Sequence, residues 1–177
     1  MKKYVILILS MFMSILIIVG FDLVDRVMIS IYGMQKYSDE DYYISYEDKE
    51  NVIVDVNLKE YTGDEKVLAE YGDEVKIVLE DIEYRGDGYR FNISCKGKGG
   101  FDGGKIISLD KFVDTTVMID NNKFMIGYGG KGSLEGNSNS YIINLYPQND
   151  MDMESISKIG NVKFELNNVR LETYTRK

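Results

Sequence analysis

The chain has 177 residues, of which 44% are hydrophobic, and a formal net charge of −8. It contains no histidine, no tryptophan and a single cysteine, so an internal disulfide, a Ser-His or Cys-His nucleophile and an imidazole zinc site are all excluded. The charge is uneven: residues 1–36 carry a net +2 and the remainder a net −10. An acidic domain of this kind argues against a nucleic-acid partner.

The N-terminus begins with an uncharged, mostly apolar run, Tyr4–Phe21, behind Lys2 and Lys3. As a helix, a run of this length spans roughly 27 Å, close to the hydrocarbon thickness of a bilayer. The two lysines predict a cytoplasmic N-terminus and an external C-terminal domain. We therefore expect residues 1–36 to form a membrane anchor and helical extension, with the bilayer contacted by Tyr4, Ile8, Phe12, Ile15, Ile18 and Phe21.

A cleaved signal peptide is the alternative, and it would make this a secreted protein. Its best cleavage site, Ile18-Val19-Gly20, has a large residue where a small one is needed, so an uncleaved anchor is favoured. Helical spacing of apolar residues continues from Leu23 to Ile31, and Gly33 is placed to cap the helix. This extension either lies on the outer membrane surface or packs on the domain that follows.

Residues 37–50 are acidic and rich in tyrosine, which is typical of a solvated juxtamembrane linker, with a short edge strand at Tyr42–Tyr46. From residue 51 to 177 the hydrophobic period changes to two, which predicts half-buried strands. The stretches with this alternation are Asn51–Lys59, Glu74–Tyr84, Tyr89–Lys96, Lys105–Leu109, Thr116–Asp120, Lys123–Tyr128, Tyr141–Pro147 and a last pair beginning at Val162 and Val169.

Turn residues separate these strands. Arg85–Gly88 and Asn121-Asn122 predict tight hairpins. The glycine-rich segments Gly97–Gly104 and Gly129–Ser140 are expected to be flexible loops. Near the C-terminus the apolar pattern shifts by three residues after Leu166, and such a slip needs a bulge or a tight turn.

The pattern as a whole predicts an all-β protein, an Ig-like antiparallel β-sandwich of about 8 strands preceded by one transmembrane helix. A small closed barrel is the alternative. Val52–Glu65 (VIVDVNLKEYTGDE) resembles the first core strand of small telokin-like, Ig-like domains exported by Gram-positive bacteria, and Val162–Leu171 (VKFELNNVRL) is similar to their last strand. The resemblance implies a surface-attached module, and it transfers no catalytic residues.

Motifs for chemistry are incomplete. Ser155–Lys158 and Ser108–Lys111 fit the SxxK pattern but lack a KTG partner, and Gly127–Ser133 lacks the residues and the helix of a phosphate loop. Cys95 falls on the apolar face of a strand, which indicates a buried structural thiol. We therefore assign no catalytic residue, cofactor or metal ligand.

Loops on a rigid scaffold are the usual place for binding residues, so the candidates are Phe101 and Asp102 in the first glycine segment and Lys131 and Asn137 in the second. The tyrosines Tyr84, Tyr128 and Tyr146 are candidates for stacking on glycans.

The expected function is that of a membrane-anchored, extracytoplasmic binding or structural module of a bacterial cell envelope, with a protein or wall-polymer ligand. The bacterial origin rests on a composition rich in Ile, Lys, Asn and Tyr. A secreted domain, an envelope immunity or protective factor, and a hydrolase that uses carboxylates alone are the alternatives. The hydrolase needs two carboxylates facing each other across a cleft.

Overall fold

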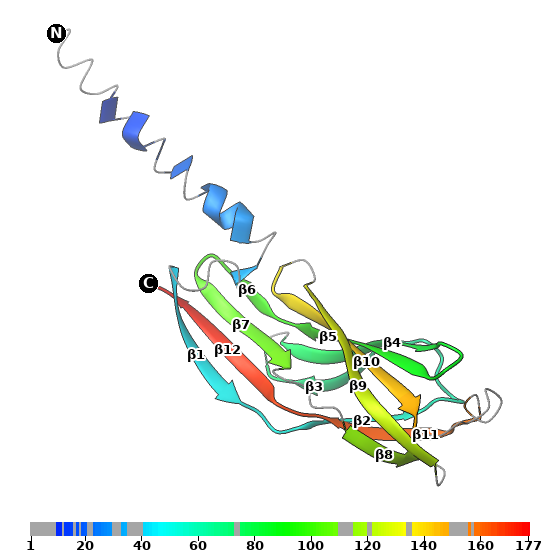
Figure 1. Ribbon diagram of the computed structural model, residues 1–177. Coiled ribbons are helices and arrows are strands. Elements are labelled where there is room, and N and C mark those ends of the chain that lie inside the picture. Colours follow the sequence, from blue (N-terminus) through cyan, green and yellow to red (C-terminus); the bar gives the residue numbers. More distant parts are fainter. Residues whose placement is uncertain are drawn as a thin grey trace, which may run out of the picture.

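The computed structural model describes residues 10–11, 13–15, 17, 19–20, 23–29, 33–34, 41–72, 75–109, 115–119, 122–133, 136–148, 156 and 158–177. These residues form an N-terminal helical segment followed by antiparallel β-sheets (Figure 1). The predicted all-β, antiparallel class is therefore confirmed. The strands are β1 (Tyr42–Asp48), β2 (Val52–Asn57), β3 (Lys66–Glu70), β4 (Lys76–Tyr84), β5 (Tyr89–Lys96), β6 (Lys98–Gly100), β7 (Gly103–Leu109), β8 (Thr115–Ile119), β9 (Asn122–Ser133), β10 (Ser138–Pro147), β11 (Asn161–Leu166) and β12 (Val169–Arg176).

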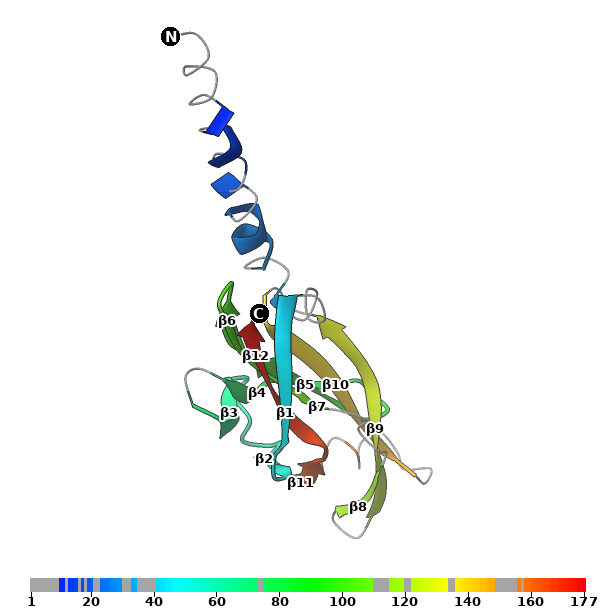
Figure 2. The same cartoon turned by 90° about the vertical axis from the view of Figure 1, so that its left-hand side faces the viewer.

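The strands belong to three sheets. The largest has the order β3-β4-β5-β10-β9-β8, the second has the order β1-β12-β7-β6, and a two-stranded sheet pairs β11 with β2. Figure 2 shows β1 beside β12. The first strand after the helix in the sequence therefore pairs with the last of the twelve strands. The prediction of about eight strands was too low, because twelve are present in the described part of the chain. The expected edge strand at Tyr42–Tyr46 is present as β1, so part of the segment expected to be a linker belongs to a sheet.

A long two-stranded ribbon with one break joins the two smaller sheets. β1 pairs with β12, and β2 continues the ribbon by pairing with β11. The break falls at Asn168, which has a φ of 55°, a conformation that asparagine tolerates better than most residues. This is the bulge or turn predicted from the shifted apolar pattern after Leu166.

The main core lies between the sheets and takes alternate residues from their strands. In the β2–β11 pair, Val54 lies opposite Phe164, and both are buried. The Phe164 ring meets the ring of Phe91 on β5 edge to face, with centroids 5.1 Å apart. Burial of each such large apolar side chain contributes about 1.5–3 kcal/mol. Strands β2 and β11 are thus neighbours on one side of this core.

A hydrogen bond through the core ties the two larger sheets together. The backbone N–H of Leu109 on β7 donates to the hydroxyl oxygen of Tyr141 on β10 at 3.1 Å. Burial, reinforced by Cys95, raises the pKa of the Tyr141 hydroxyl. The tyrosine therefore stays neutral. Its ring packs in the core, and its hydroxyl oxygen accepts the hydrogen bond.

The glycine-rich segments are largely strands, so their prediction as flexible loops was wrong. Residues 98–100 and 103–109 form the β6–β7 hairpin, and β9 continues through its glycines to Ser133. A Cβ added at Gly104 would overlap the backbone of β6, and one added at Gly129 would overlap the Asn144 side chain. These glycines allow close approach between strands, which a composition-based prediction reads as flexibility.

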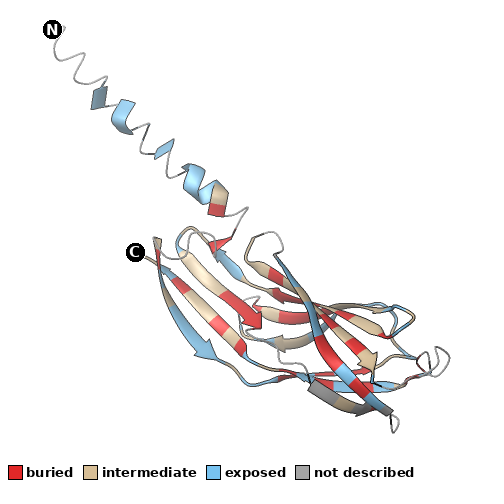
Figure 3. Cartoon of the chain, viewed as in Figure 1, coloured by how far each residue is buried: buried red, intermediate tan, exposed pale blue. Residues whose placement is uncertain are grey.

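The N-terminal helix points away from the sheets (Figure 1). Its described residues between 10 and 28 are exposed or half-exposed, whereas Ile29 is buried at the end nearest the domain (Figure 3). Within the described residues, no helix combines the length and the apolar character needed to cross a bilayer. Of the predicted anchor residues, Ile15 is described and exposed, whereas Tyr4, Ile8, Phe12, Ile18 and Phe21 lie outside the described residues.

Candidate functional site

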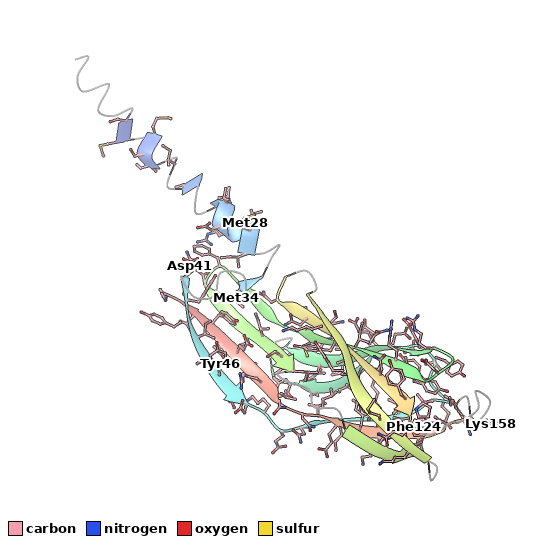
Figure 4. All side chains as sticks on the ribbon, viewed as in Figure 1. Met28, Met34, Asp41, Tyr46, Phe124 and Lys158 are labelled. Atoms are coloured by element: carbon pink, nitrogen blue, oxygen red, sulfur yellow. The ribbon has the colours of Figure 1, made fainter. Side chains whose placement is uncertain are left out.

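The end of the helix docks into a second, smaller core. Gly33 adopts a φ of 77°, and its N–H donates to the carbonyl of Ile29 at 2.8 Å, which ends the helix as the sequence predicted. The chain then places Met34, fully buried, between the helix and the domain (Figure 4). Ile29 and Met34 pack with residues of three strands, namely Tyr42, Ile106 and Tyr174.

Glycines make the socket for Met34. A Cβ added at Gly99 would lie 2.8 Å from the Met34 sulfur, and one at Gly104 would lie 2.9 Å from its Cε. Because real Cβ atoms do not approach this closely, the Met34 side chain would have to shift if either glycine carried a side chain. The first glycine segment is therefore a docking surface for the helix end.

Phe101, a predicted binding residue at the tip of the β6–β7 hairpin, packs with the smaller core. The guanidinium carbons of Arg26 and Arg176 lie 4.2 Å and 3.9 Å from its ring centroid. The hydroxyl of Tyr42 donates to the Phe101 carbonyl at 2.9 Å. These contacts join the helix, the hairpin and the end of the β1–β12 pair at which Tyr42 lies opposite Arg176.

The other predicted residues divide into two groups. Asn137 accepts a hydrogen bond from the Met34 N–H at 2.8 Å and donates one to the Gly99 carbonyl at 3.1 Å. Asp102 is exposed beside Phe101, and its carbonyl accepts from the Arg176 N–H. Lys131 lies apart on β9, with its ammonium 5.6 Å from the Tyr141 ring. Three of the four residues thus gather at the helix junction, where Phe101 and Asn137 hold the chain together.

Cys95 has the buried character that the sequence predicted. It is fully inaccessible, and burial raises the pKa of its thiol to about 12 despite the opposing charge of Lys131. A thiol with this pKa is protonated at neutral pH and is a poor nucleophile. The geometry gives Cys95 a packing role.

Three pockets lie at separate places on the described surface. One follows the β6–β7 glycines, and a second lies between the connection from β1 to β2 and strand β3. The third, of about 200 Å³, lies beside the Arg85–Gly88 turn. Among the described residues, none of these pockets is lined by two carboxylates, which is the arrangement that the hydrolase alternative requires.

The fold and its junction define an antiparallel all-β domain carried at the end of an N-terminal helix. No family model, curated protein or solved structure matches the chain.

Sequence reasoning found the helix cap and the residues of the hairpin tip, but it missed what they contact. The burial of Met34 could not be predicted from the sequence, because a single apolar residue after a capping glycine belongs to no periodic pattern. The pairing of Asn137 with Met34 joins positions 103 residues apart, and local patterns carry no information at that separation. The glycines were the available signal: their density at Gly97–Gly104 marked a place of close approach.

Proposed function

We propose that this chain is a single-pass, membrane-anchored module of a bacterial cell envelope, with a cytoplasmic N-terminus and the β-domain outside. The supporting observation is the exposure of large apolar side chains along the helix. Each is 49–61% exposed although the helix end is buried in the domain: Met11, Met13, Ile15, Ile17, Val19, Leu23, Val24 and Val27. A bilayer would cover these side chains, and the uncharged run Tyr4–Phe21 would extend that contact.

In this proposal the domain is an Ig-like sandwich, formed by the six-stranded sheet on one side of the core and the broken β1/β2–β12/β11 ribbon with β7 on the other. Its role is binding or structural support, not catalysis. Because the helix enters at the β6–β7 end, that end lies next to the membrane. The opposite end, where Phe124 and Lys158 lie in Figure 4, is then the one presented to external ligands.

Cell fractionation tests the anchor. We expect the protein at its full mass of 20.3 kDa in the membrane pellet after carbonate extraction, with the β-domain digested when protease is added to intact protoplasts. An Ile15→Lys variant should shift toward the soluble fraction, because a lysine at the helix centre disfavours insertion by about 2.5–3.5 kcal/mol, whereas Ile15→Leu should not.

Two results would contradict the anchor. One is a shortened protein in the medium, which indicates signal cleavage and a secreted domain. The other is full-length protein that stays soluble with both residue 15 variants.

A further inference from the structure

The pocket beside the Arg85–Gly88 turn lies at the end of the domain away from the helix. The turn connects β4 and β5, with Tyr84 paired to Tyr89 at its base. In the neighbouring strands Leu145 pairs with Tyr89 and Pro147 pairs with Phe124, the residue that marks the far end in Figure 4. At the other end of the same sheet, Lys96 pairs with Ser138, next to the Asn137 that holds the helix.

Arg90 is one of the residues that line this pocket. Its Nε is buried and has no hydrogen-bond partner among the described residues. Glu83, directly opposite on β4, forms an ion pair with Arg85 and accepts a hydrogen bond from Asn92 at 3.3 Å. The carboxylate nearest in register is thus shared by two other side chains and does not pair with the Arg90 Nε–H. A buried donor without a partner is costly unless a ligand satisfies it.

The remaining lining residues complete a mixed set of donors and acceptors. Asp87 offers a carboxylate, Asn144 an amide, and Tyr146 an aromatic ring with a hydroxyl. Gly88 brings the turn against β10: a Cβ there would overlap the Leu145 carbonyl and lie 3.4 Å from Tyr146 Cδ1. The turn is held in place by hydrogen bonds from Arg85 N–H to the Gly88 carbonyl and from the Tyr84 hydroxyl to the Gly86 carbonyl.

We infer that this pocket binds one neutral sugar unit of an envelope glycan. Hydroxyl groups are both donors and acceptors, so they match an arginine, a carboxylate and an amide placed together, and a tyrosine supplies an apolar surface for the ring. The charges favour a neutral ligand. Arg85 is balanced by Glu83, which leaves one positive group in Arg90 and one negative group in Asp87. A phosphate polymer would need an excess of cations.

This inference depends on the proposed function for the source of the ligand, because an external far end would face the glycans of the envelope. It adds the class of ligand and the residues that bind it.

Nuclear magnetic resonance on the full-length chain in detergent micelles tests the site. The probes are N-acetylglucosamine, glucose and inorganic phosphate, each titrated separately against the backbone amide signal of Gly88 and the side-chain amide signals of Asn144. We expect a saturable shift with at least one of the two sugars and none with phosphate. Arg90→Gln and Asn144→Ala should each weaken the affinity at least tenfold.

Arg170→Gln is the matched control, because Arg170 is an arginine on the other sheet that contacts Asp48. It should leave the sugar titration unchanged. If Arg90→Gln does not fold, Asn144→Ala and Tyr146→Ala provide the same test.

The inference is overturned if neither sugar causes a saturable shift, if the pocket variants bind as the unmodified chain does, or if phosphate causes the larger shift. The carbonate extraction described above is independent of these variants. A failed titration with an intact anchor therefore rejects the sugar site alone, whereas a soluble protein with a normal titration rejects the anchor alone.

Discussion

Gly33 shows how one residue can join two parts of this molecule. Its positive φ lets the helix end with a hydrogen bond to Ile29, and the lack of a Cβ lets the chain pass against the carbonyl of Gly136. The first property was predicted from sequence, because glycine after a helical pattern is a common cap. The second was not, because it depends on a contact with a residue far away in the sequence.

We expect Gly33→Ala to destabilise the docked helix end by about 1–2 kcal/mol or more, because a left-handed conformation costs an L-residue that amount before the overlap with Gly136 is counted. Chemical denaturation of the full chain, together with limited proteolysis after residue 29, measures the effect. Gly20→Ala is the control, since among the described residues no atom outside its own helix backbone lies within 4 Å of its added Cβ. Equal effects of the two substitutions would show that Gly33 has no special role.

The buried thiol of Cys95 predicts a loss of stability in alkali. Burial raises its pKa from 9.0 to about 12, so between these values the unfolded chain releases a proton that the folded chain keeps. The free energy of unfolding should fall as pH rises above 9, by at most about 1.4 kcal/mol per pH unit. Urea denaturation between pH 7.5 and 10 measures this slope. In the Cys95→Ala variant the free energy of unfolding should fall less steeply with pH. If it falls as steeply as in the unmodified chain, the Cys95 thiol is not the group whose raised pKa causes the loss.

Among the elements, the β6–β7 hairpin departs most from its sequence-based prediction. Strands with a regular alternation, such as β2 and β11, were predicted well because burial on one face imposes a period of two. The tight Arg85–Gly88 turn followed from its turn residues. The turn predicted at Asn121-Asn122 was placed too late, because Asn122 already pairs with Ile119 at the start of β9. The hairpin of glycines has no such period, since its strands are defined by close backbone packing and by the methionine that lies against them.

We expect Gly104→Ala to lower the free energy of unfolding by about 1–3 kcal/mol, because the added methyl group overlaps β6 and meets Met34 in a packed site. Gly100→Ala, in the same hairpin, should change it by less than about 0.5 kcal/mol, since its Cβ would project into open space. Urea denaturation of the two variants gives the comparison. The socket would be in doubt if both variants were equally stable.

At the scale of the whole molecule, the described residues form two hydrophobic cores of different size, and each core joins different elements. The larger core joins the sheets, and the smaller one joins the helix end to Tyr42, Ile106 and Tyr174. The candidate binding loops were expected to face a partner, yet Phe101 and Asn137 belong to this smaller core or support it. In the fold, Phe101 contacts Arg26 of the chain's own helix, and Asn137 accepts a hydrogen bond from Met34 just after it.

A chain that begins at residue 23 should therefore keep the stability of the β-domain, because it retains Ile29 and Met34. A chain that begins at residue 41 should lose about 2–5 kcal/mol, as expected when buried apolar side chains are removed from a core. Thermal unfolding of the two proteins makes the comparison. Equal midpoints would mean that the smaller core contributes nothing to the stability of the domain.

The strand order β1-β12-β7-β6 also has a consequence for how the domain folds. β12 lies between β1 and β7, so this sheet forms only when strands far apart in the sequence have met. Such distant pairings form slowly. We therefore expect the pairing of β1 with β12 to be a late step in the folding of the domain.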